Sequence, residues 1–328
     1  MKKINLAVVG ATGMVGRTVL KVLEERAVPI ENFYAFSSKR SAGCSLEFCG
    51  KEYLAAELTE NSFNKGIDIA IFCAGGEISE KFAPIAAAKG CIVVDNSSHF
   101  RMHEGVPLIV PEVNPEDIKR HKGIIANPNC STIQAMVVLK PLLDRYGLKR
   151  VIYSTYQSVS GAGLGGWQDL ENGTNNTFSR PIAYNLIPQI DAFLENGYTK
   201  EEMKMIKESR KILGLKDLKV TATTVRVPVF SSHSESINIE LNSPFNVEDV
   251  KALFRSSKGV VLMDDVDNNI FPTPLDAAGK DEVFAGRIRR DESVENGLNL
   301  FCVADNLRKG AATNAVQIVE LLLKEGEI

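Results

Sequence analysis

The chain has 328 residues, of which 44% are hydrophobic, and it is longer than a single-core domain usually is. We therefore expect two domains. Lys and Arg number 38 and Asp and Glu number 41, so the net charge of −3 excludes a positive field that would attract nucleic acid or an anionic membrane. Any anionic ligand must be held by local charges.

The N-terminus and the cysteine pattern indicate the compartment. Met1–Asn5 leads into a strand-like segment without a signal-type apolar stretch, and no run approaches the ~18 apolar residues of a membrane span. The six cysteines and four histidines show neither CxxC pairs nor metal-ligand spacing, which favours reduced thiols over disulfides or a zinc site. We expect a cytoplasmic protein without a metal.

The first 130 residues alternate β-rich and helical segments. The β-rich segments are nearly continuous in apolar residues, as strands buried on both faces of a parallel sheet are. The pattern predicts a doubly wound α/β domain. The expected strands are Ile4–Val9, Phe33–Phe36, Ile67–Cys73 and Cys91–Val94, and the expected helices are Thr18–Arg26 and Ile78–Lys89, the second kinked or shortened by Pro84.

A second domain, of the α+β class, is expected to begin near residue 130. Several of its strands alternate apolar and polar residues, which indicates an antiparallel sheet with one covered face. The expected elements are a helix at Ile133–Tyr146 and strands at Arg150–Gln157, Lys219–Val229, Ser236–Leu241 and Leu298–Ala304.

Two further segments complete the predicted organisation. Gly161–Asn176 is rich in Gly and Asn and is expected to form a long loop. The last helix, Ala311–Lys324, is apolar on much of its surface and is expected to pack on the first domain. The predicted domains are therefore residues 1–129 plus 306–328, and residues 130–305.

A glycine-rich turn joins the first strand to the first helix. Gly10, Gly13 and Gly16 follow a G-x-x-G-x-x-G spacing, which lets backbone amides at a helix N-terminus approach a pyrophosphate. An ordinary tight turn is the alternative. The position at the first βα junction favours a dinucleotide site, with contacts from Gly10, Thr12, Gly13, Met14 and Val15.

The end of the second strand bears on the choice of cofactor. Folds that prefer NAD usually place an Asp or Glu there to hold the ribose 2′-hydroxyl. This chain instead has Ser37–Ser41, with the sequence Ser-Ser-Lys-Arg-Ser. Hydroxyl groups and cations suit a 2′-phosphate, so the sequence predicts NADP bound by Arg40 and Ser41. A solvated basic loop is the alternative.

Cys130 is the candidate nucleophile. It lies in Asn127–Thr132, directly before an apolar helix, and the positive end of a helix favours thiolate over thiol. A buried inert cysteine is the more common case, so the hypothesis needs partners. Asn129 is a candidate substrate contact, or alternatively the helix N-cap.

Candidate partners follow in two segments. Tyr156–Gly163 is a strand end with a Gly-rich turn, where Ser160 and Gly161 bring backbone close to a flat ring. Thr224–Glu235 carries Arg226 and His233, which together offer an anion clamp and a general base. Alone, each of these side chains has an ordinary structural or surface reading.

The chain resembles the aspartate-semialdehyde dehydrogenases, and the bacterial type among them. The resemblance runs nearly end to end through six ordered motifs: Gly10–Gly16, Asp95–Ser98, Asn127–Thr132, Tyr156–Gly163, Arg226–Glu235 and Asp305–Ala312. It implies the reversible, NADPH-dependent reductive dephosphorylation of L-aspartyl 4-phosphate to L-aspartate 4-semialdehyde and phosphate. This reaction belongs to lysine, diaminopimelate, threonine and methionine biosynthesis.

The resemblance also implies a role for each matched residue. Cys130 would be the acyl-thioester nucleophile and His233 the acid/base. Gln157 would orient the substrate, Arg226 would bind its α-carboxylate, and Arg101 its phosphate. It further implies that Glu201 meets the substrate ammonium, Lys204 the phosphate, and Asn306 the nicotinamide end of NADP, and that the enzyme is a homodimer.

Other functions are compatible with parts of the pattern. A reductase of another acyl phosphate, such as N-acetylglutamyl phosphate, would share the fold, thiol and histidine, but its substrate has no free ammonium. The Cys-Thr-Thr-Asn pattern of a glyceraldehyde-phosphate type dehydrogenase is not found. An NADP-binding regulator would typically lose the nucleophile, the base or the anion clamp, and all three are present.

Overall fold

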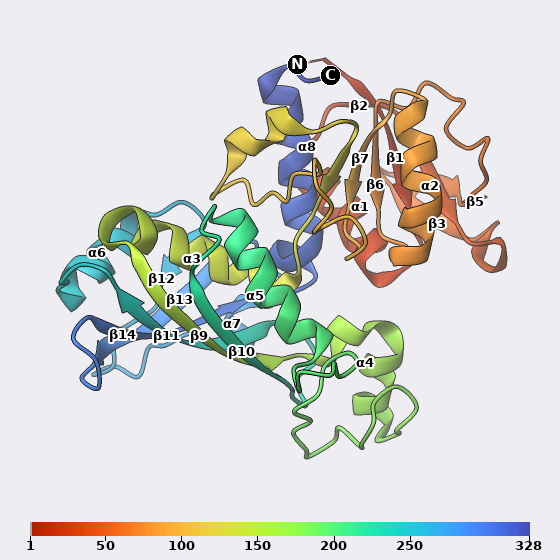
Figure 1. Cartoon of the computed structure of the whole chain (residues 1–328). Coiled ribbons are helices and arrows are strands. Elements are labelled where there is room, and N and C mark those ends of the chain that lie inside the picture. Colours follow the sequence, from red (N-terminus) through yellow and green to blue (C-terminus); the bar gives the residue numbers. More distant parts are fainter. Residues whose placement is uncertain (1) are drawn as a thin grey trace. The chain divides into compact units, whose positions relative to one another are not determined.

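The computed structural model describes residues 2–328 and divides into two compact units (Figure 1). Unit 1 comprises the chain up to Asn129 together with Ala311–Ile328, and unit 2 is Cys130–Gly310. The chain thus returns to unit 1 at Ala311 rather than at the expected Asn306. The intervening segment stays with unit 2 because Asn306 is hydrogen-bonded there and Gly310 packs against Cys130.

Unit 1 is built on a six-stranded sheet in the order β5-β2-β1-β6-β7-β8, in which every strand pair is parallel. A two-stranded antiparallel hairpin, β3-β4, accompanies it. The elements are β1 (Ile4–Val9), α1 (Met14–Glu25), β2 (Ile30–Ser37), β3 (Ser45–Phe48), β4 (Lys51–Leu54), β5 (Ala56–Glu57), β6 (Ile69–Phe72), α2 (Gly76–Ala88), β7 (Ile92–Asp95), β8 (Ile124–Ala126) and α8 (Thr313–Glu325).

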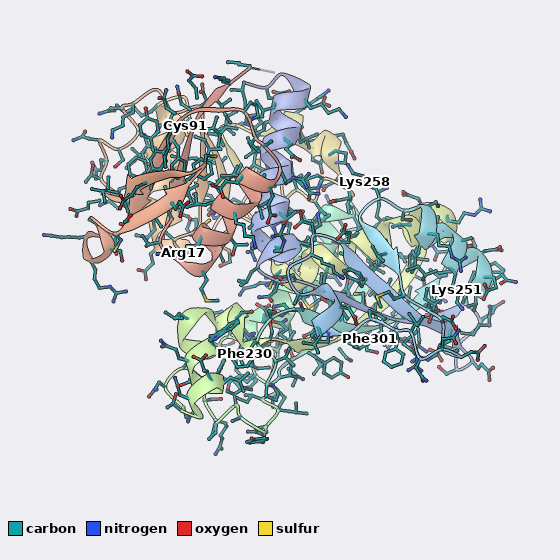
Figure 2. All side chains as sticks on the ribbon, turned by 180° about the vertical axis from the view of Figure 1, so that it is seen from behind. Arg17, Cys91, Phe230, Lys251, Lys258 and Phe301 are labelled. Atoms are coloured by element: carbon teal, nitrogen blue, oxygen red, sulfur yellow. The ribbon has the colours of Figure 1, made fainter. Side chains whose placement is uncertain are left out.

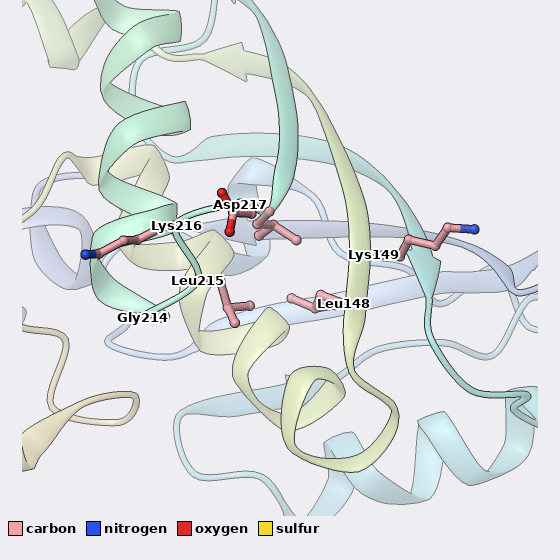
Figure 3. A pocket seen from close by; sticks show the side chains of 7 residues that line it. Leu148, Lys149, Gly214, Leu215, Lys216 and Asp217 are labelled. Atoms are coloured by element: carbon pink, nitrogen blue, oxygen red, sulfur yellow. The ribbon is translucent and has the colours of Figure 1, made fainter.

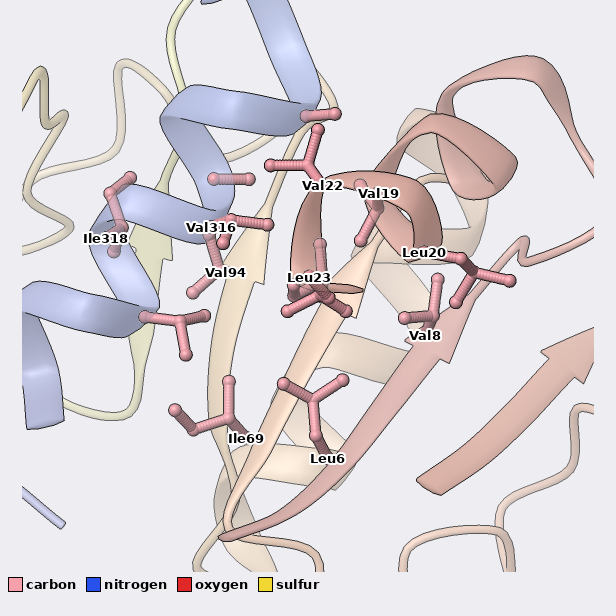
Figure 4. Close-up of a cluster of buried hydrophobic side chains, with 14 of the residues drawn as sticks. Leu6, Val8, Val19, Leu20, Val22, Leu23, Ile69, Val94, Val316 and Ile318 are labelled. Carbon is pink, nitrogen blue, oxygen red and sulfur yellow. The ribbon is translucent and has the colours of Figure 1, made fainter. Parts of the chain in front are cut away.

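Helices cover both faces of this sheet, as a doubly wound fold requires. On one face α1 and α8 pack over β1, β6 and β7, through side chains such as Leu23, Leu6 and Val316 (Figure 4). On the other face α2 contributes Phe82 and Ala86 to a second cluster. Each fully buried aliphatic side chain stabilises the fold by roughly 1.5–3 kcal/mol. The C-terminal helix α8 therefore belongs to the core of unit 1.

Pro84 does not shorten α2, which was one of the two effects expected of it. The proline lies inside the helix, but the helix continues to Ala88 rather than ending before it. Pro84 is exposed on the solvent side. Its missing N–H leaves the carbonyl of Glu80 without a helical partner, and at this exposed position water can replace that bond.

Unit 2 is built on a six-stranded sheet in the order β10-β9-β11-β14-β13-β12. The sheet is mixed rather than wholly antiparallel, because the pairs β10–β9 and β12–β13 are parallel. The elements are α3 (Cys130–Tyr146), β9 (Leu148–Gln157), α4 (Gly163–Asn172), α5 (Lys200–Ile212), β10 (Lys219–Arg226), β11 (His233–Leu241), α6 (Val247–Ser256), β12 (Val260–Leu262), α7 (Pro274–Ala277), β13 (Val283–Asp291) and β14 (Gly297–Ala304).

Three helices, α3, α5 and α6, pack on one face of this sheet (Figure 1). On the opposite face the rings of Tyr156 and Phe301 lie 6.3 Å apart, and Tyr156 remains partly exposed. Phe301 extends from its strand in the side-chain view (Figure 2). The helix-covered face is the one that carries the candidate catalytic residues.

The prediction of a loop at Gly161–Asn176 is wrong, because most of this segment forms α4. The helix packs through Trp167, whose ring centroid lies 4.8 Å from that of Phe230, and through Leu170, which joins a small buried cluster. Gly166 has no room for a side chain, since a β-carbon there would lie 2.6 Å from the Val159 carbonyl. A glycine that suggested a loop instead permits close packing of a helix.

Candidate active site

The glycine turn of unit 1 has the shape that a pyrophosphate site needs. Gly10 has a positive φ of 81°, and a β-carbon on Gly16 would lie 2.2 Å from the Gly10 carbonyl oxygen. Gly13 is the N-cap of α1, and no side chain caps that helix end. The backbone N–H groups at the start of α1 therefore stay available for an anion. Thr12, Met14 and Val15 are partly buried beside them.

The residues expected at the 2′-phosphate follow β2, next to β1 in the sheet. Residues Lys39–Ser41 form a short 3-10 helix in which Arg40 is exposed and Ser41 half-buried. Within residues 2–328, Arg40 makes no hydrogen bond or ion pair. Its guanidinium is therefore not committed to a carboxylate of the chain.

Arg101 is buried at the carboxyl ends of the parallel strands. Its Nε donates to the Asn127 carbonyl at 2.9 Å, and its Nη2 donates to the Asn96 carbonyl at 2.9 Å. Asn127 also binds the returning chain, since its Oδ1 accepts from the Asn314 side chain at 2.7 Å. Asn129 is buried at the end of this segment, and α3 begins at the next residue.

Cys130 is the first residue of α3, as the helix-terminus argument requires. Its side chain is half-buried. A β-carbon on Gly310 would lie 2.8 Å from the Cβ of Cys130, so only glycine leaves this approach open. The thiol therefore lies at the positive end of a helix dipole, where a thiolate is stabilised.

His233 is the first residue of β11 and is completely buried. The backbone N–H of Ser158 donates to its Nδ1 at 3.1 Å, which places the proton of the neutral ring on Nε2. Burial, and secondarily the charge of Arg226, lowers the pKa of His233 well below its ordinary value. The imidazole is thus neutral near pH 7. Within residues 2–328 its Nε2 has no hydrogen-bond partner.

Arg226 ends β10 and lies beside His233. Its Nη1 donates to the Ser158 carbonyl at 2.6 Å. A β-carbon on Gly161 would lie 2.9 Å from that nitrogen and 3.4 Å from His233 Nε2, so Gly161 touches both side chains. Burial lowers the pKa of Arg226, and nearby Glu201 and Cys130 act against the shift. Arg226 therefore lies close to both the His233 imidazole and the Cys130 thiol in unit 2.

A chain of side-chain hydrogen bonds leads from this group to α5. Gln157 Nε2 donates to Glu201 Oε1 at 3.3 Å, and Lys204 Nζ donates to Glu201 Oε2 at 3.1 Å. Lys204 also donates to Asp191 Oδ2 at 2.9 Å. Although burial acts to lower it, the pKa of Lys204 is raised by the Glu201 and Asp191 carboxylates. The i, i+3 pair on α5 is therefore part of the site rather than a solvated surface pair.

Asn306 joins three segments in the interior of unit 2. Its Oδ1 accepts from Ser158 Oγ at 3.0 Å, from Ser160 Oγ at 3.2 Å and from the Ser232 backbone N–H at 2.9 Å. Ser232 has a positive φ of 72°, so this bond fixes a strained turn directly before His233. Asn306 and Ser160 are both buried and bound to each other.

Three contributors to the site were not predicted from the sequence. Asp191 binds Lys204 from a loop, and nothing in its local sequence indicates this contact. Gln134 lies one helical turn after Cys130, and Glu235 two residues after His233 on the same strand face. The helix and strand periodicities could have placed both next to the catalytic residues.

Among the cavities formed by the described residues, one adjoins the candidate site and another lies far from it. One, of about 260 Å³, is lined by Arg226 together with Phe178, Ile187 and Asp191, and so adjoins the candidate site. The other, of about 500 Å³, lies where β9 begins, roughly 30 Å along the strand from Gln157. There Leu148 and Leu215 face each other while two lysines point outward (Figure 3). Its lining residues include none of the predicted catalytic, substrate-binding or cofactor-binding residues.

The structure shows no sign of a metal or a membrane span over the part of the chain it describes. No cluster of three or more potential His, Cys, Asp or Glu ligands occurs within residues 2–328. No helix in that range is long and apolar enough to cross a bilayer.

Comparisons with known proteins agree with this arrangement. Residues 5–121 match the family model "Semialdehyde dehydrogenase, NAD binding domain", and residues 139–309 match "Semialdehyde dehydrogenase, dimerisation domain". The aspartate-semialdehyde dehydrogenase of Aquifex aeolicus is 54% identical over 99% of both chains. The chain belongs to the aspartate-semialdehyde dehydrogenase family.

Solved structures extend the agreement to three dimensions. The aspartate-semialdehyde dehydrogenase II of Vibrio cholerae, solved with ASA, matches with a TM-score of 0.96 and 48% identity over 99% of each chain. The enzyme of Candida albicans, solved with NADP, matches with a TM-score of 0.80 and 26% identity over 100% of each. The family's activity is reductive dephosphorylation of L-aspartyl 4-phosphate to L-aspartate 4-semialdehyde, and an N-acetylglutamyl phosphate reductase is not favoured.

Proposed function

We propose that the chain performs this reaction with NADPH through a thioester on Cys130. The observation that carries the proposal is the grouping of a helix-terminal thiol, a neutral imidazole with an unengaged Nε2 and a buried guanidinium in one unit. The thiol can attack the acyl carbon of a dianionic acyl phosphate, the imidazole Nε2–H can donate a hydrogen bond to it, and the guanidinium can bind one of its negative charges.

In the biosynthetic direction the Cys130 thiolate attacks the β-acyl carbon of aspartyl phosphate. The carbon–sulfur bond forms, the acyl carbon–oxygen bond to phosphate breaks, and phosphate leaves with the bonding electrons. This gives a β-aspartyl thioester. The bound cofactor supplies the hydride that reduces this thioester. Reduction turns the carbonyl oxygen into an oxyanion on a carbon still bonded to sulfur.

His233 is assigned as the acid/base for this oxygen. Because Nδ1 accepts the Ser158 N–H, Nε2–H is the group that can donate to the oxyanion. The proton is shared with the oxyanion and stabilises it, since complete transfer from the neutral ring would leave an imidazolate anion. When the carbon–sulfur bond breaks, the electron pair on oxygen re-forms the carbonyl, the proton returns fully to Nε2, and the aldehyde and the Cys130 thiolate are released. The protein ends in the protonation state in which it began.

The remaining polar residues are assigned to the charged ends of the substrate. Arg226 would bind the α-carboxylate, since one nitrogen of its fork is fixed on Ser158 while others stay available. Glu201 would bind the ammonium, with Gln157 orienting the acyl group between them. The phosphate is assigned to Arg101 and Lys204, and Asn129 is assigned to the substrate beside the thiol.

The choice of NADP rests on the end of β2. A group with a 2′-phosphate fits Arg40 and Ser41, which bring a cation and a hydroxyl and no carboxylate to that position. The pyrophosphate is assigned to Gly10–Val15 at the start of α1. Ser160, Gly161 and Asn306 are the proposed contacts of the nicotinamide end.

We further propose a homodimer formed through the face of the unit 2 sheet that carries Tyr156 and Phe301. These rings are partly accessible in the single chain, and this part of the sequence matches a family model described as a dimerisation domain. The cytoplasmic location stays a prediction of the sequence.

The direct test is phosphate-dependent reduction of NADP with L-aspartate 4-semialdehyde as substrate. We expect turnover that requires both phosphate and the aldehyde, with a much lower rate for N-acetylglutamate semialdehyde because it has no ammonium for Glu201. Reduction that proceeds equally without phosphate would contradict the acyl-transfer step. Equal rates for both aldehydes would remove Glu201 from substrate selection.

A further inference from the structure

A second polar layer lies beneath the catalytic residues on the helix-covered face of the unit 2 sheet. Glu235 is two residues after His233 on β11 and is completely buried. It pairs directly with Cys302 on β14 and with Thr155 on β9. These side chains form a row next to the row of Arg226, Gln157 and His233. The mechanism does not use any of them.

Glu235 is an acid in surroundings that cannot support a negative charge. Within residues 2–328, neither carboxyl oxygen makes a hydrogen bond of acceptable geometry, and the one donor group that acts on the carboxyl is the Gln134 amide. A buried carboxylate without donors or a cation costs several kcal/mol, and such a group normally takes up a proton instead. Burial raises the pKa of Glu235 well above its ordinary value; the Gln134 amide acts against this shift and repulsion from Glu201 adds to it.

The titratable groups that face Glu235 supply no compensating cation. Cys302 on β14 and Tyr153 on β9 both have a pKa raised by burial, so they stay neutral. His233 on β11 has a lowered pKa and is neutral as well. Glu201 on α5 adds a like charge. From α3, the neighbouring side chain is the amide of Gln134.

Gln134 also has a buried polar atom without a hydrogen-bond partner, and that atom is an acceptor. Its Nε2 donates to the backbone carbonyl of His233 at 3.2 Å and contacts the Cys302 sulfur at 4.0 Å. Its Oε1 is buried without a donor within residues 2–328. A single proton on Glu235 removes both deficits, because the acid then has an O–H to give and Gln134 Oε1 has a free lone pair.

Gln134 lies one turn beyond Cys130 on α3, and it binds the carbonyl of His233. We propose that Glu235 is an un-ionised carboxylic acid that donates to Gln134 and thereby holds the nucleophile's helix in register with the strand of the acid/base. Glu235 is thus a positioning residue, which never touches the substrate. This inference rests on the proposed roles of Cys130 and His233.

Infrared spectroscopy of the whole enzyme tests the protonation state without using activity. The difference spectrum between wild type and Glu235→Gln should show the carbonyl stretch of an un-ionised acid near pH 7, with a shift in deuterated water. The matched control is Glu202→Gln. Glu202 is also buried, but its oxygens accept backbone N–H bonds from Thr199 and Thr224 at 2.7 and 3.1 Å, so this band should not change. A wild-type spectrum without the band would overturn the proposal.

The pH dependence of stability gives a second readout. In the unfolded chain Glu235 ionises above its ordinary pKa, whereas in the folded chain it keeps its proton to a higher pH. Its contribution to stability is therefore complete at low pH and is lost as pH rises through that window. Relative to Glu235→Gln, the unfolding constant of wild type should increase up to tenfold per pH unit there. Parallel pH curves would contradict a buried acid.

Kinetics separate positioning from mere packing. The amide of Glu235→Gln replaces the O–H with an N–H donor, so kcat near neutral pH should stay within about threefold of wild type. Glu235→Leu leaves Gln134 Oε1 without a donor, and we expect kcat to fall on the order of 10²-fold while KM changes little. In wild type kcat should decrease at alkaline pH as Glu235 loses its proton. In Glu235→Gln, which has no such proton to lose, this decrease should move to higher pH.

The outcomes distinguish this inference from the proposed function. If Glu235→Leu folds and retains wild-type kcat, the positioning role is overturned while the thioester stands. If Glu235→Leu does not fold, Gln134→Leu provides the same test from the other partner, because it removes the bond to His233. If Cys130 forms no acyl adduct while the infrared band is present, the proposed function fails and the un-ionised acid stands.

Discussion

The two units present their candidate residues in opposite ways. In unit 1 the proposed cofactor contacts are backbone amides at the start of α1 and the exposed side chain of Arg40, which forms no hydrogen bond or ion pair within residues 2–328. In unit 2 His233 and Arg226 are buried, and both are hydrogen-bonded to Ser158. Each proposed cofactor contact in unit 1 can therefore form independently of the others. In unit 2, by contrast, the reaction depends on the relative positions of several side chains that hold one another in place.

This difference predicts two kinds of mutational effect. Substitutions in unit 2 should reduce kcat strongly, because one displaced group misplaces its partners. Substitutions in unit 1 should change cofactor affinity or choice and leave the chemical step nearly intact.

The largest effect is expected for Cys130→Ala. Without the nucleophile no thioester forms, so kcat should fall by at least about 10⁴-fold, while NADPH affinity stays near that of wild type. Steady-state rates and NADPH fluorescence titration measure the two quantities. Cys44→Ala is the matched control, since that thiol is exposed and lies in the other unit. Substantial activity in Cys130→Ala would refute covalent catalysis.

His233→Asn should have the next largest effect. Asparagine can still accept the Ser158 N–H, but it cannot exchange a proton with the substrate oxygen, so kcat should fall on the order of 10²–10⁴-fold. The acid limb of kcat/KM, which the lowered pKa of His233 places below the ordinary histidine value, should disappear. His121→Asn, a half-buried histidine of unit 1, is the control. An effect confined to KM would make His233 a binding residue.

Arg226→Lys should have a smaller effect, on kcat/KM for the semialdehyde. Lysine keeps the charge but loses the fork that binds Ser158 and a carboxylate together, and we expect a decrease of tenfold or more. Arg210→Lys is the control, because Arg210 is a partly buried arginine on α5 with no assigned role in the site. Its kcat/KM should stay near that of wild type. If kcat/KM of Arg226→Lys is unaltered, the α-carboxylate is held elsewhere.

Arg40→Ala should have the smallest effect. It tests whether a substitution in unit 1 changes the choice of cofactor without affecting the chemical step. Loss of one exposed ion pair, worth ~1 kcal/mol, should reduce the ratio of kcat/KM for NADP to that for NAD by about fivefold. The kcat at saturating NADP should hardly change. The activity with NAD is the internal control, since NAD has no 2′-phosphate. An unchanged ratio would remove Arg40 from cofactor choice.

Sequence patterns predicted unit 1 more completely than unit 2. Its central strands are short and apolar, so β1 was predicted at its observed bounds and α8 was placed in the correct core. The return of the chain at Ala311 was missed because Asn306 and Gly310 bind within unit 2, and no local pattern shows that. In unit 2 the parallel edge pairs of the sheet depend on tertiary pairing, which alternation of residues does not encode.

The active site divides in the same way. Cys130, Arg226 and His233 lie in local patterns with a physical meaning, a helix start and a strand end. Asp191 reaches Lys204 from a loop with no pattern at all. The glycine-rich composition of Gly161–Asn176 predicted a long loop, yet the space left by Gly166 lets α4 pack closely. The sequence alone therefore does not reveal contacts between residues that are distant in the chain. It also does not reveal where a glycine is needed for close packing of the backbone.

The central claim is the thioester on Cys130, and mass mapping of an acyl adduct tests it most directly. The enzyme is incubated with L-aspartate 4-semialdehyde and NADP without phosphate, quenched in acid and digested. We predict a β-aspartyl adduct on the peptide that contains Cys130, and its loss in Cys130→Ala and on addition of phosphate before the quench. An adduct on another residue, or NADP reduction with no adduct, would contradict the account.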